Sequence, residues 1–295
     1  MKYKNEKISD KHNKIKSIFI ASNFVQETED GNVSQHQAQA LADITKLERV
    51  ITDLDIMRKY STTPIEARSF LMDYFVAHEL RNYKFDLAFF NGAPFGMTTH
   101  VLKPAKTIVS ITAHNIELSN EECKAKNGYD SFPFDGLTDK QLLNSYFQHI
   151  SDADVVICPS KLSANYLSTR LQLKNSMAVI PYGCFFPEEI QVKSTEDFSI
   201  AHVGANTSNR GQLYLIRAWH KLKLTPRFKG NMVIVGPGTG FWRPFGVFSS
   251  EHLTNCEKVY NDCSVYVQPS VTEGFGVQVL EAMAHARPVI VTEGV

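Results

Sequence analysis

The sequence predicts an α/β protein with two domains, each built on a parallel β-sheet that helices cover on both faces. Predicted strands and helices alternate along the chain, as they do in doubly wound folds. Several predicted strands are continuous apolar and β-branched runs, which is typical of parallel sheets with two buried faces. The 295 residues are more than one small core needs, and they therefore indicate two domains.

The predicted N-terminal domain comprises residues 1–187. It begins with a strand, followed by a loop that contains Asp30, Gly31 and Asn32 and then by a helix. Strands are expected at residues 15–21, 85–90, 107–112, 154–158 and 177–180, and helices at 33–46 and 160–171. Residues 181–187 begin and end with Pro, and we expect them to turn the chain out of this domain.

The predicted C-terminal domain comprises residues 198–295 and follows a polar linker at residues 188–197. Strands are expected at residues 198–204, 231–236 and 265–267, and helices at 211–224 and 251–261. A further short helix is expected after Gly276. The alternation of strands and helices therefore continues through the second half of the chain.

Composition excludes several classes of protein. The formal net charge is zero, so nothing in the overall charge indicates a nucleic-acid partner. No apolar run reaches the roughly 18 to 20 residues that a membrane-spanning helix needs. The five cysteines are scattered and form no CxxC pair, which indicates neither a disulfide framework nor a zinc site. We therefore expect free thiols in a cytoplasmic protein.

The most informative segment runs from Thr272 to Ile290. Two carboxylates, Glu273 and Glu281, are separated by seven residues, and a Gly-Phe-Gly turn follows the first. A predicted strand, a glycine loop and a helix start occur in that order, which presents free backbone N–H groups to an anionic ligand. The two carboxylates are too far apart to act as one acid/base pair, and they suit two separate sets of hydroxyls.

This segment resembles the Glu-x7-Glu motif of retaining glycosyltransferases of the GT-B fold, above all glycosyltransferase family 4 (glycosyl transferases group 1). In that family two Rossmann-like domains face each other across a cleft. The resemblance implies that Glu273 contacts the transferred sugar and Glu281 the ribose of the nucleotide. It also implies that backbone amides of the turn contact the sugar and the diphosphate, namely those of Gly274, Phe275 and Gly276.

Shorter segments extend the resemblance over about residues 108–295, and their order matches that of the family. They are Val155–Ser160, Val179–Gly183, Val203-Gly204 with Arg210-Gly211, and Val233–Gly238. Three positions depart from the family pattern. Tyr182 replaces the usual Asn, Ala205 replaces the usual Arg, and Arg210 stands where the family has Lys.

Two further candidates would complete a donor site. Arg210, at the start of a predicted helix, can bind two phosphate oxygens at once, and the helix dipole would assist it; the resemblance places Gly204 in the same loop. His114 lies just beyond a predicted strand, where open α/β sheets bind ligands, and the resemblance implies that it reaches the donor sugar. A surface arginine and a structural histidine are the alternative interpretations.

The resemblance implies transfer of a hexose from a UDP-, GDP- or ADP-sugar to an acceptor hydroxyl, with retention of configuration. The acceptor would be a glycan, a lipid or a small molecule, in glycan or polysaccharide biosynthesis. Neither a metal nor another cofactor is expected. A non-catalytic nucleotide- or sugar-binding relative, an inactive fragment, and a GT-B epimerase or phosphorylase are the alternatives.

Two departures concern the C-terminal domain. Only residues 241–245 separate Gly240 from Gly246, where the family normally has a helix and a strand. The chain stops at Val295, where family members continue through a further sheet segment and a helix. We therefore expect a second domain that is abbreviated and incomplete, could lack a strand, and comes from a chain truncated at its C-terminus.

The first 16 residues are rich in lysine and carry few acidic residues. Such a segment can contact anionic lipid, at about 1 kcal/mol per charge near the surface. A solvated tail is the other interpretation. The predicted location is therefore the cytoplasm, either free or at the inner face of a membrane.

Overall fold

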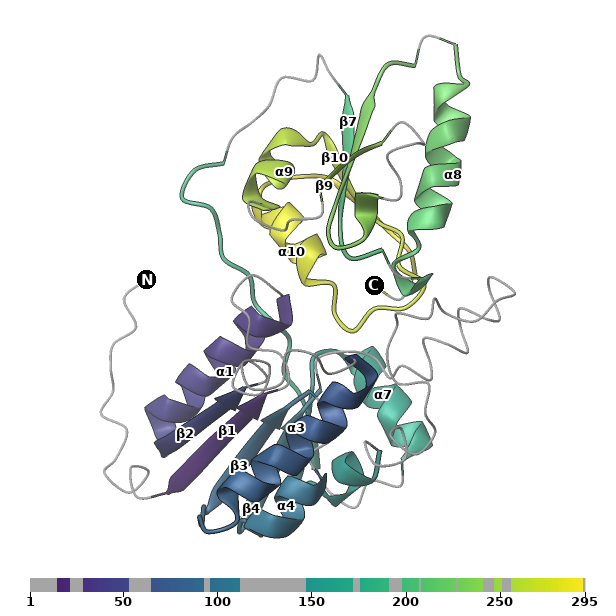
Figure 1. Cartoon of the computed structure of the whole chain (residues 1–295). Helices are drawn as coiled ribbons and strands as arrows, with labels where there is room; N and C mark the ends of the chain where they lie inside the picture. Colours follow the sequence, from purple (N-terminus) through teal and green to yellow (C-terminus); the bar gives the residue numbers. More distant parts are fainter. Residues whose placement is uncertain are drawn as a thin grey trace. The chain divides into compact units, whose positions relative to one another are not determined.

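The computed structural model describes most of both predicted domains (Figure 1). The described ranges are residues 15–21, 29–52, 65–92, 96–111, 147–171, 176–190, 198–206, 208–226, 228–240, 247–250, 256–293 and 295. They divide into two compact units: unit 1 ends at Ile180, and unit 2 runs from Pro181 to Val295. The domain limits at residues 187 and 198 stay a prediction.

Among its described residues, unit 1 contains a six-stranded sheet in the order β2-β1-β3-β4-β5-β6, in which every pairing is parallel. Its strands are β1 (Lys16–Ala21), β2 (Lys46–Thr52), β3 (Leu87–Asn91), β4 (Lys106–Ser110), β5 (Val155–Cys158) and β6 (Ser176–Val179). Its helices include α1 (Glu29–Ile44), α3 (Ile65–Leu80), α4 (Gly96–Leu102) and α7 (Lys161–Arg170). The strand order reverses at β1, as expected for a doubly wound fold.

The core of unit 1 lies on both faces of this sheet, and β1 shows how. Ile18 and Ile20 belong to one buried cluster, together with residues of α3 and α7. Phe19 and Ala21 belong to a second cluster, together with Leu41 of α1. Because successive side chains of a strand point to opposite faces, two buried faces require a continuous apolar run. Packing on both faces of the sheet therefore explains the continuous apolar runs from which these strands were predicted.

Unit 2 contains a five-stranded parallel sheet among its described residues, in the order β11-β10-β7-β8-β9. Its strands are β7 (Ser199–Val203), β8 (Asn231–Val235), β9 (Phe248–Ser250), β10 (Val265–Gln268) and β11 (Val289–Val291). Its helices are α8 (Gln212–Lys223), α9 (Cys256–Asp262) and α10 (Val277–Ala284), with a short 3-10 helix, η2, at Ser208–Arg210. Two buried clusters again cover its sheet.

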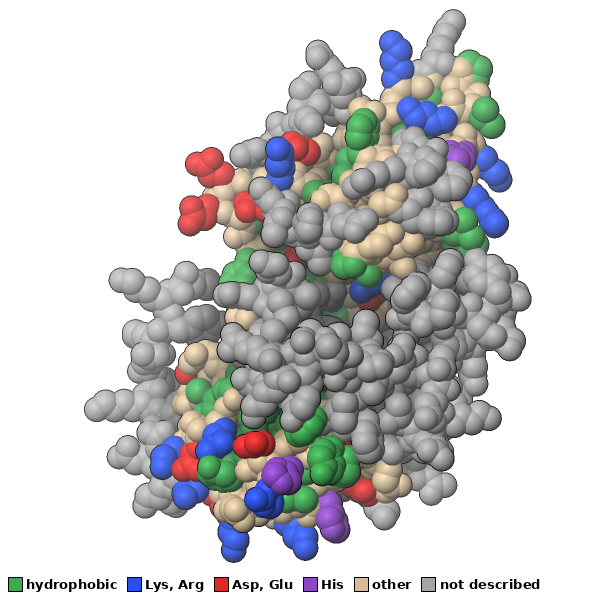
Figure 2. All heavy atoms as spheres, in the orientation of Figure 1, with side chains coloured by type: hydrophobic (Ala, Val, Ile, Leu, Met, Phe, Trp, Pro, Cys, Tyr) green, Lys and Arg blue, Asp and Glu red, His purple; other side chains and the backbone are tan. Residues whose placement is uncertain are grey.

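Helix α8 has one buried face and a basic last turn. Its buried residues recur at helical spacing: Gln212, Leu215, Ile216 and Trp219. Its last turn carries His220, Lys221 and Lys223, whose basic side chains suit the negative end of the helix dipole. Figure 2 shows basic side chains on the outer surface of this part of unit 2. The helix therefore packs on the sheet by one face and begins at the loop that follows β7.

Gly211 directly precedes helix α8, and only glycine fits at this position. Gly211 has a φ of +66°, and a Cβ added there would lie 1.8 Å from the carbonyl oxygen of Pro269. A backbone this close to another backbone has no room for a side chain, and the left-handed φ itself favours glycine. The contact holds the start of α8 against the loop that follows β10.

The structure corrects one expectation and adds elements that were not predicted. Helix α1 already begins at Glu29, so Asp30, Gly31 and Asn32 lie in the helix and not in a loop before it. Strand β2 and helix α3 were not predicted; β2 is an edge strand with mostly exposed residues, and its apolar signal is weak. In unit 2, strand β9 lies beyond the short connection after Gly240 and was likewise not predicted. Among the described helices none is long and apolar enough to cross a membrane.

Candidate functional site

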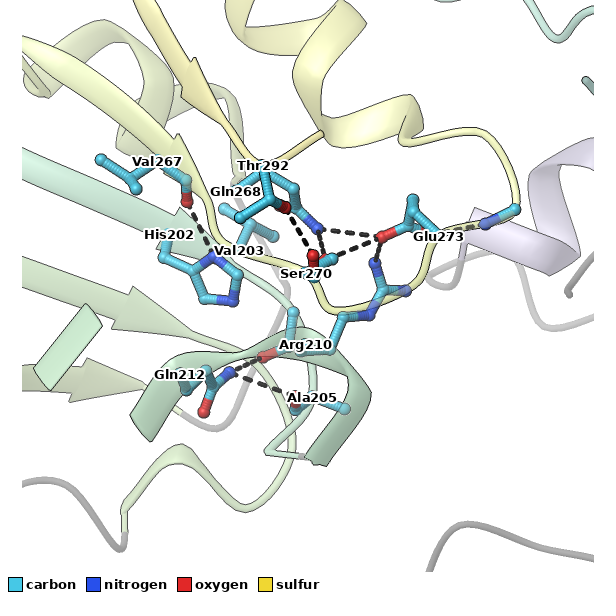
Figure 3. A network of polar contacts seen from close by, with 12 residues as sticks. His202, Val203, Ala205, Arg210, Gln212, Val267, Gln268, Ser270, Glu273 and Thr292 are labelled. Carbon is cyan, nitrogen blue, oxygen red and sulfur yellow. Dashed lines mark hydrogen bonds and ion pairs between the residues drawn. The ribbon is translucent and has the colours of Figure 1, made fainter. Parts of the chain in front are cut away.

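The candidate site lies at the carboxyl ends of β7 and β10 in unit 2 (Figure 3). These two strands are neighbours in the sheet, so the loops that follow them lie side by side. One loop leads from β7 through η2 into α8, and the other leads from β10 into α10. Ligands of open α/β sheets bind at this edge.

Glu273 is the centre of a polar network in these loops. Its Oε2 accepts hydrogen bonds from Arg210 Nη1 at 2.5 Å, from Gln268 Nε2 at 3.1 Å and from Ser270 Oγ at 3.1 Å. Its Oε1 accepts one from the backbone N–H of Gly274 at 3.3 Å. One carboxylate oxygen is therefore crowded with donors, while the other is less engaged among the described residues.

Glu273 pairs with Arg210, the residue that was predicted from the sequence to bind the diphosphate. Arg210 and Glu273 form an ion pair whose side chains are only 20% and 9% exposed. Removing one member of a largely buried pair leaves an uncompensated charge, which is costly. The pair thus fixes the η2 loop and the loop after β10 to each other across 63 residues of sequence.

The loop after β7 is held by hydrogen bonds that its backbone carbonyls accept from a side chain of α8. Gln212, at the start of α8, donates from Nε2 to the carbonyls of Gly204 at 3.0 Å and Ala205 at 3.1 Å. Gly204 has its Cα beside His202, because a Cβ there would lie 3.2 Å from His202 Nε2. Gly204 therefore lies in the loop next to Arg210, and its donor-binding role stays a prediction. Gln212 is an unpredicted member of the site.

His202 lies behind this loop and is a buried neutral histidine. Its Nδ1–H donates to the carbonyl of Val267 at 2.9 Å, which leaves Nε2 without a proton. His202 Nε2 is buried and has no hydrogen-bond partner among the described residues. Burial lowers the pKa of His202 to about 4, and the nearby Arg210 acts in the same direction.

Glu281 is held separately, by a tyrosine of α9. Tyr260 OH donates to Glu281 Oε2 at 2.6 Å. Burial raises the pKa of Glu281, while the hydrogen bond from Tyr260 and the proximity of His285 oppose the rise. The charge of Glu281 also helps to raise the pKa values of Cys184 and Cys256, after their own burial. Among the described residues the Glu281 carboxylate thus has one hydrogen-bond donor, whereas that of Glu273 has four.

The Gly-Phe-Gly turn connects the two carboxylates. Gly276, with a φ of +79°, precedes the first residue of α10, and no side chain caps that helix start. Phe275 packs edge-on against Tyr182, with ring centroids 5.2 Å apart. Tyr182 is the residue that departs from the family's usual Asn, and in the structure it supports this turn. Backbone N–H groups at the start of α10 suit an anionic group.

The structure therefore brings together most of the predicted site residues. Hydrogen bonds connect Arg210, Glu273 and Gly274 directly, while Glu281 belongs to a second group with Tyr260. His114 lies outside the described residues. Sequence reasoning missed Gln268, Ser270, Gln212, Tyr260 and Tyr266. The polar Gln268 at the end of an apolar strand was the available signal, because a buried amide needs partners.

Acidic triplets of the Asp-x-Asp kind occur in unit 1, and they bear on the expected lack of a metal site. They are Asp53-Leu54-Asp55 and Asp152-Ala153-Asp154. The first lies outside the described residues. In the second, Asp154 binds Lys106 at 2.8 Å and the backbone of Thr107 at 2.8 Å, while Asp152 accepts from Gln148. The described residues contain no group of three or more potential metal ligands, and metal independence stays a prediction.

Comparisons with known proteins place the fold. Residues 197–295, about a third of the chain, match the family model described as "Glycosyl transferases group 1". No match was found among curated proteins. Among solved structures, sucrose-phosphate synthase from Thermosynechococcus elongatus is 17% identical with a TM-score of 0.72, over 95% of this chain and 82% of that one.

Two further structures show the same likeness. The lipopolysaccharide outer core galactosyltransferase WaaB is 13% identical with a TM-score of 0.58, over 95% of this chain and 81% of that one. A trehalose-6-phosphate synthase is 10% identical with a TM-score of 0.58, over 93% of this chain and 83% of that one. Such low identity shows the fold alone. The chain has the parallel α/β units of the GT-B fold, as predicted.

Proposed function

We propose that the chain is a retaining glycosyltransferase that transfers a hexose from a nucleotide-diphosphate sugar to an acceptor hydroxyl. The observation that carries the proposal is the Arg210–Glu273 ion pair at the carboxyl edge of the unit 2 sheet. It brings together one cation suited to a diphosphate and one carboxylate suited to sugar hydroxyls. The family match over residues 197–295 and the GT-B fold support the same activity.

The leaving diphosphate needs positive charge, and unit 2 offers two sources. Arg210 presents a guanidinium group, which binds phosphate oxygens in a fixed fork. The start of α10 adds the positive end of a helix dipole, and among the described residues no side chain caps it. Such preorganised donors stabilise developing negative charge without reorganisation, which is often the largest contribution to catalysis.

Glu273 would orient the transferred sugar. Its Oε2 is occupied by three side-chain donors, which hold the carboxylate in one orientation. Its Oε1 is then the oxygen that accepts hydrogen bonds from sugar hydroxyls. Retention of configuration belongs to this proposal; the trehalose-6-phosphate synthase neighbour is described in terms of glycosyltransfer with retention. The proposed role of His114 at the sugar rests on the sequence resemblance.

Glu281 would contact the ribose of the nucleotide. Its Oε2 is the acceptor of the Tyr260 hydroxyl, so its remaining acceptor capacity is available to ribose hydroxyls. Burial raises the pKa of Glu281, but the hydrogen bond from Tyr260 favours the charged form. A UDP-, GDP- or ADP-sugar fits this description equally, and neither a metal nor another cofactor is part of the proposal.

A non-catalytic nucleotide- or sugar-binding protein is the second candidate. Ala205 replaces the family's usual Arg, and Arg210 is paired with Glu273 in this structure. A diphosphate would therefore meet less free positive charge than in the family. Such a protein would bind the donor but would not transfer its sugar, so turnover separates the two candidates.

The first experiment is thermal unfolding of the purified chain with UDP, GDP, ADP and their hexose conjugates. A ligand that binds only the folded state stabilises it by about 2.7 kcal/mol at 100 times its dissociation constant. A shift with one nucleotide family, lost in Glu281→Ala, would support the donor site. Release of free nucleoside diphosphate from the matching sugar conjugate, with an acceptor panel of glycans and polyols, then tests transfer. The absence of any shift in a cooperatively melting chain would contradict both candidates.

The cytoplasmic location, and contact with a membrane through the lysine-rich first 16 residues, also remain proposals. Those residues are almost entirely outside the described ranges. Sedimentation with anionic and with neutral liposomes tests the contact. Protein that stays in the supernatant with both would contradict it.

A further inference from the structure

Two buried tyrosines of unit 2 contact each other next to the two glutamates. Tyr260 of α9 and Tyr266 of β10 are 1% and 0% exposed, respectively. Their rings meet edge to face, with centroids 5.6 Å apart and planes at 67°. Burial raises the pKa of each phenol well above 10, so both are protonated at neutral pH and can donate one hydrogen bond.

Tyr260 acts on Glu281 directly. Its hydroxyl donates to Glu281 Oε2 at 2.6 Å, a short hydrogen bond of the kind that a charged acceptor makes. Glu281 lies on α10 and Tyr260 on α9, so the bond fixes a side chain of one helix relative to the other. The bond occupies one oxygen of Glu281.

Tyr266 acts on Glu273 through Gln268. The Tyr266 hydroxyl is 2.6 Å from Gln268 Oε1 and 3.4 Å from the carbonyl oxygen of Val203. A phenol has a single proton, and the shorter distance assigns it to Gln268. The amide oxygen of Gln268 is thereby turned toward Tyr266.

The orientation of the Gln268 amide decides how Glu273 is held. With Oε1 on Tyr266, the NH₂ group faces Ser270 Oγ at 2.9 Å and Glu273 Oε2 at 3.1 Å. The flipped amide would place its oxygen against the Glu273 carboxylate and its NH₂ group against the Tyr266 hydroxyl. Gln268 is 0% exposed, so water cannot compensate that arrangement.

We infer that Tyr260 and Tyr266 are positioning residues, Tyr260 for the carboxylate of Glu281 and Tyr266, through Gln268, for that of Glu273. This inference rests on the proposed function. The rings alone fill the core, and phenylalanine would fill it as well. The two hydroxyls aim the carboxylates, one at the nucleoside and one at the transferred sugar, so their removal should have separable effects.

The test is a matched pair of variants, Tyr266→Phe and Tyr260→Phe, that delete only the two hydroxyls. Tyr266→Phe should lower kcat about 10-fold, while the Kd for the nucleoside diphosphate changes less than about 2-fold. Tyr260→Phe should raise that Kd about 10-fold and have the smaller effect on kcat. These sizes correspond to one hydrogen bond to a charged group. Tyr214→Phe, on a 39% exposed tyrosine of α8, controls for the substitution itself.

A double-mutant cycle tests the path through Gln268. Gln268→Leu should lower kcat at least as much as Tyr266→Phe, and the two changes together should do no more than Gln268→Leu alone. Additive effects would mean that Tyr266 acts by another route and would overturn that half of the inference. Equal losses of kcat and affinity in both tyrosine variants, in step with a lower Tm, would indicate a merely structural role and overturn the whole.

A ligand-free measurement separates this inference from the proposed function. In protein labelled with ¹³C at glutamate carboxyls, Tyr260→Phe should shift the Glu281 resonance and raise its pKa. Tyr266→Phe should shift the Glu273 resonance and leave that of Glu281 unchanged. If the wild-type chain turns over no donor, the proposed function fails, and these resonances alone decide whether the tyrosines position the carboxylates. Unchanged resonances would overturn the inference.

Discussion

The two units have different polar networks at the carboxyl ends of their central strands. In unit 1, uncharged groups meet at the carboxyl edge: Asn91 Nδ2 donates to Gln37 Oε1 at 2.5 Å, and Gln37 Nε2 donates to Ser110 Oγ at 2.8 Å. In unit 2, the corresponding edge carries the ion pair of Arg210 and Glu273. The same kind of sheet thus supports a neutral network in one unit and a charged one in the other.

Among the described residues, the same architecture therefore carries either kind of network at this edge. The amide and hydroxyl network fastens helix α1 to strands β3 and β4 at little electrostatic cost. The charged network must overcome the desolvation of two ions, and three donors on one oxygen help to do so. Charge at that edge suits a diphosphate and sugar hydroxyls, whereas neutral groups suit hydroxyls alone.

The largest effect is expected at Gly211 of unit 2, where the backbone is left-handed and touches another backbone segment. Gly211→Ala should destabilise unit 2 by about 3 kcal/mol or more, because the new Cβ would overlap the carbonyl oxygen of Pro269 and the φ is left-handed. In unit 1, a Cβ at Gly96 would meet nothing within 4 Å, so Gly96→Ala should stay within about 1 kcal/mol of the wild type. Urea unfolding of both variants, with probes in each unit, measures the contrast. Similar losses would contradict the close approach at Gly211.

The next effect concerns the charged network itself. Glu273→Ala should lower kcat about 100-fold, comparable to the loss of one preorganised group in an active site. The change in KM should be smaller, because the nucleoside contacts remain. In the matched variant Asn91→Ala, which removes an amide from the unit 1 network, kcat should fall by less. If the kcat of Glu273→Ala equals that of the wild type, Glu273 does not have the proposed role.

Acid should weaken both units alike, since each contains a buried neutral histidine. Burial lowers the pKa of His149 in unit 1 and of His202 in unit 2 to about 4, against 6.5 in the unfolded chain. The unfolded state therefore binds more protons between pH 6.5 and about 4, and stability present above pH 6.5 is lost as the pH falls. The loss is about 1.4 kcal/mol per histidine for each pH unit in that window.

Denaturant unfolding at pH 7.5, 6.5 and 5.5 measures this loss. The variants His149→Gln and His202→Gln separate the two units, because each should flatten the pH dependence of its own unit. A free energy of unfolding that is constant from pH 7.5 to 5.5 would show that neither histidine is buried in its neutral form.

The smallest effect is expected at the second carboxylate. Glu281→Ala should weaken binding of the nucleoside diphosphate about 10-fold, which is the size of one or two hydrogen bonds to ribose hydroxyls. Glu257→Ala, an acidic residue in the first turn of α9, serves as the control and should leave that affinity unchanged. Calorimetric titration of the matching nucleotide measures both. Equal affinities in wild type and Glu281→Ala would place the ribose elsewhere.

Much of the fold could be predicted from local sequence. The strands with two buried faces, such as β1 and β3, are continuous apolar runs that local periodicity reveals. Strand β2 was missed because an edge strand with Lys46, Glu48 and Arg49 carries no such run. Helix α1 was predicted four residues too short at its start, because Asp30, Gly31 and Asn32 are residues that favour loops.

The sequence by itself determined the alternation of strands and helices, the glycine turn and the spacing of Glu273 and Glu281. These properties are local, and they follow from side-chain periodicity and from the backbone freedom of glycine. The tertiary structure alone decided that Arg210 pairs with Glu273 and that Tyr260 and Tyr266 serve different carboxylates. Those contacts depend on β7 lying next to β10, and the order of strands in a sheet is set by the packing of the whole unit.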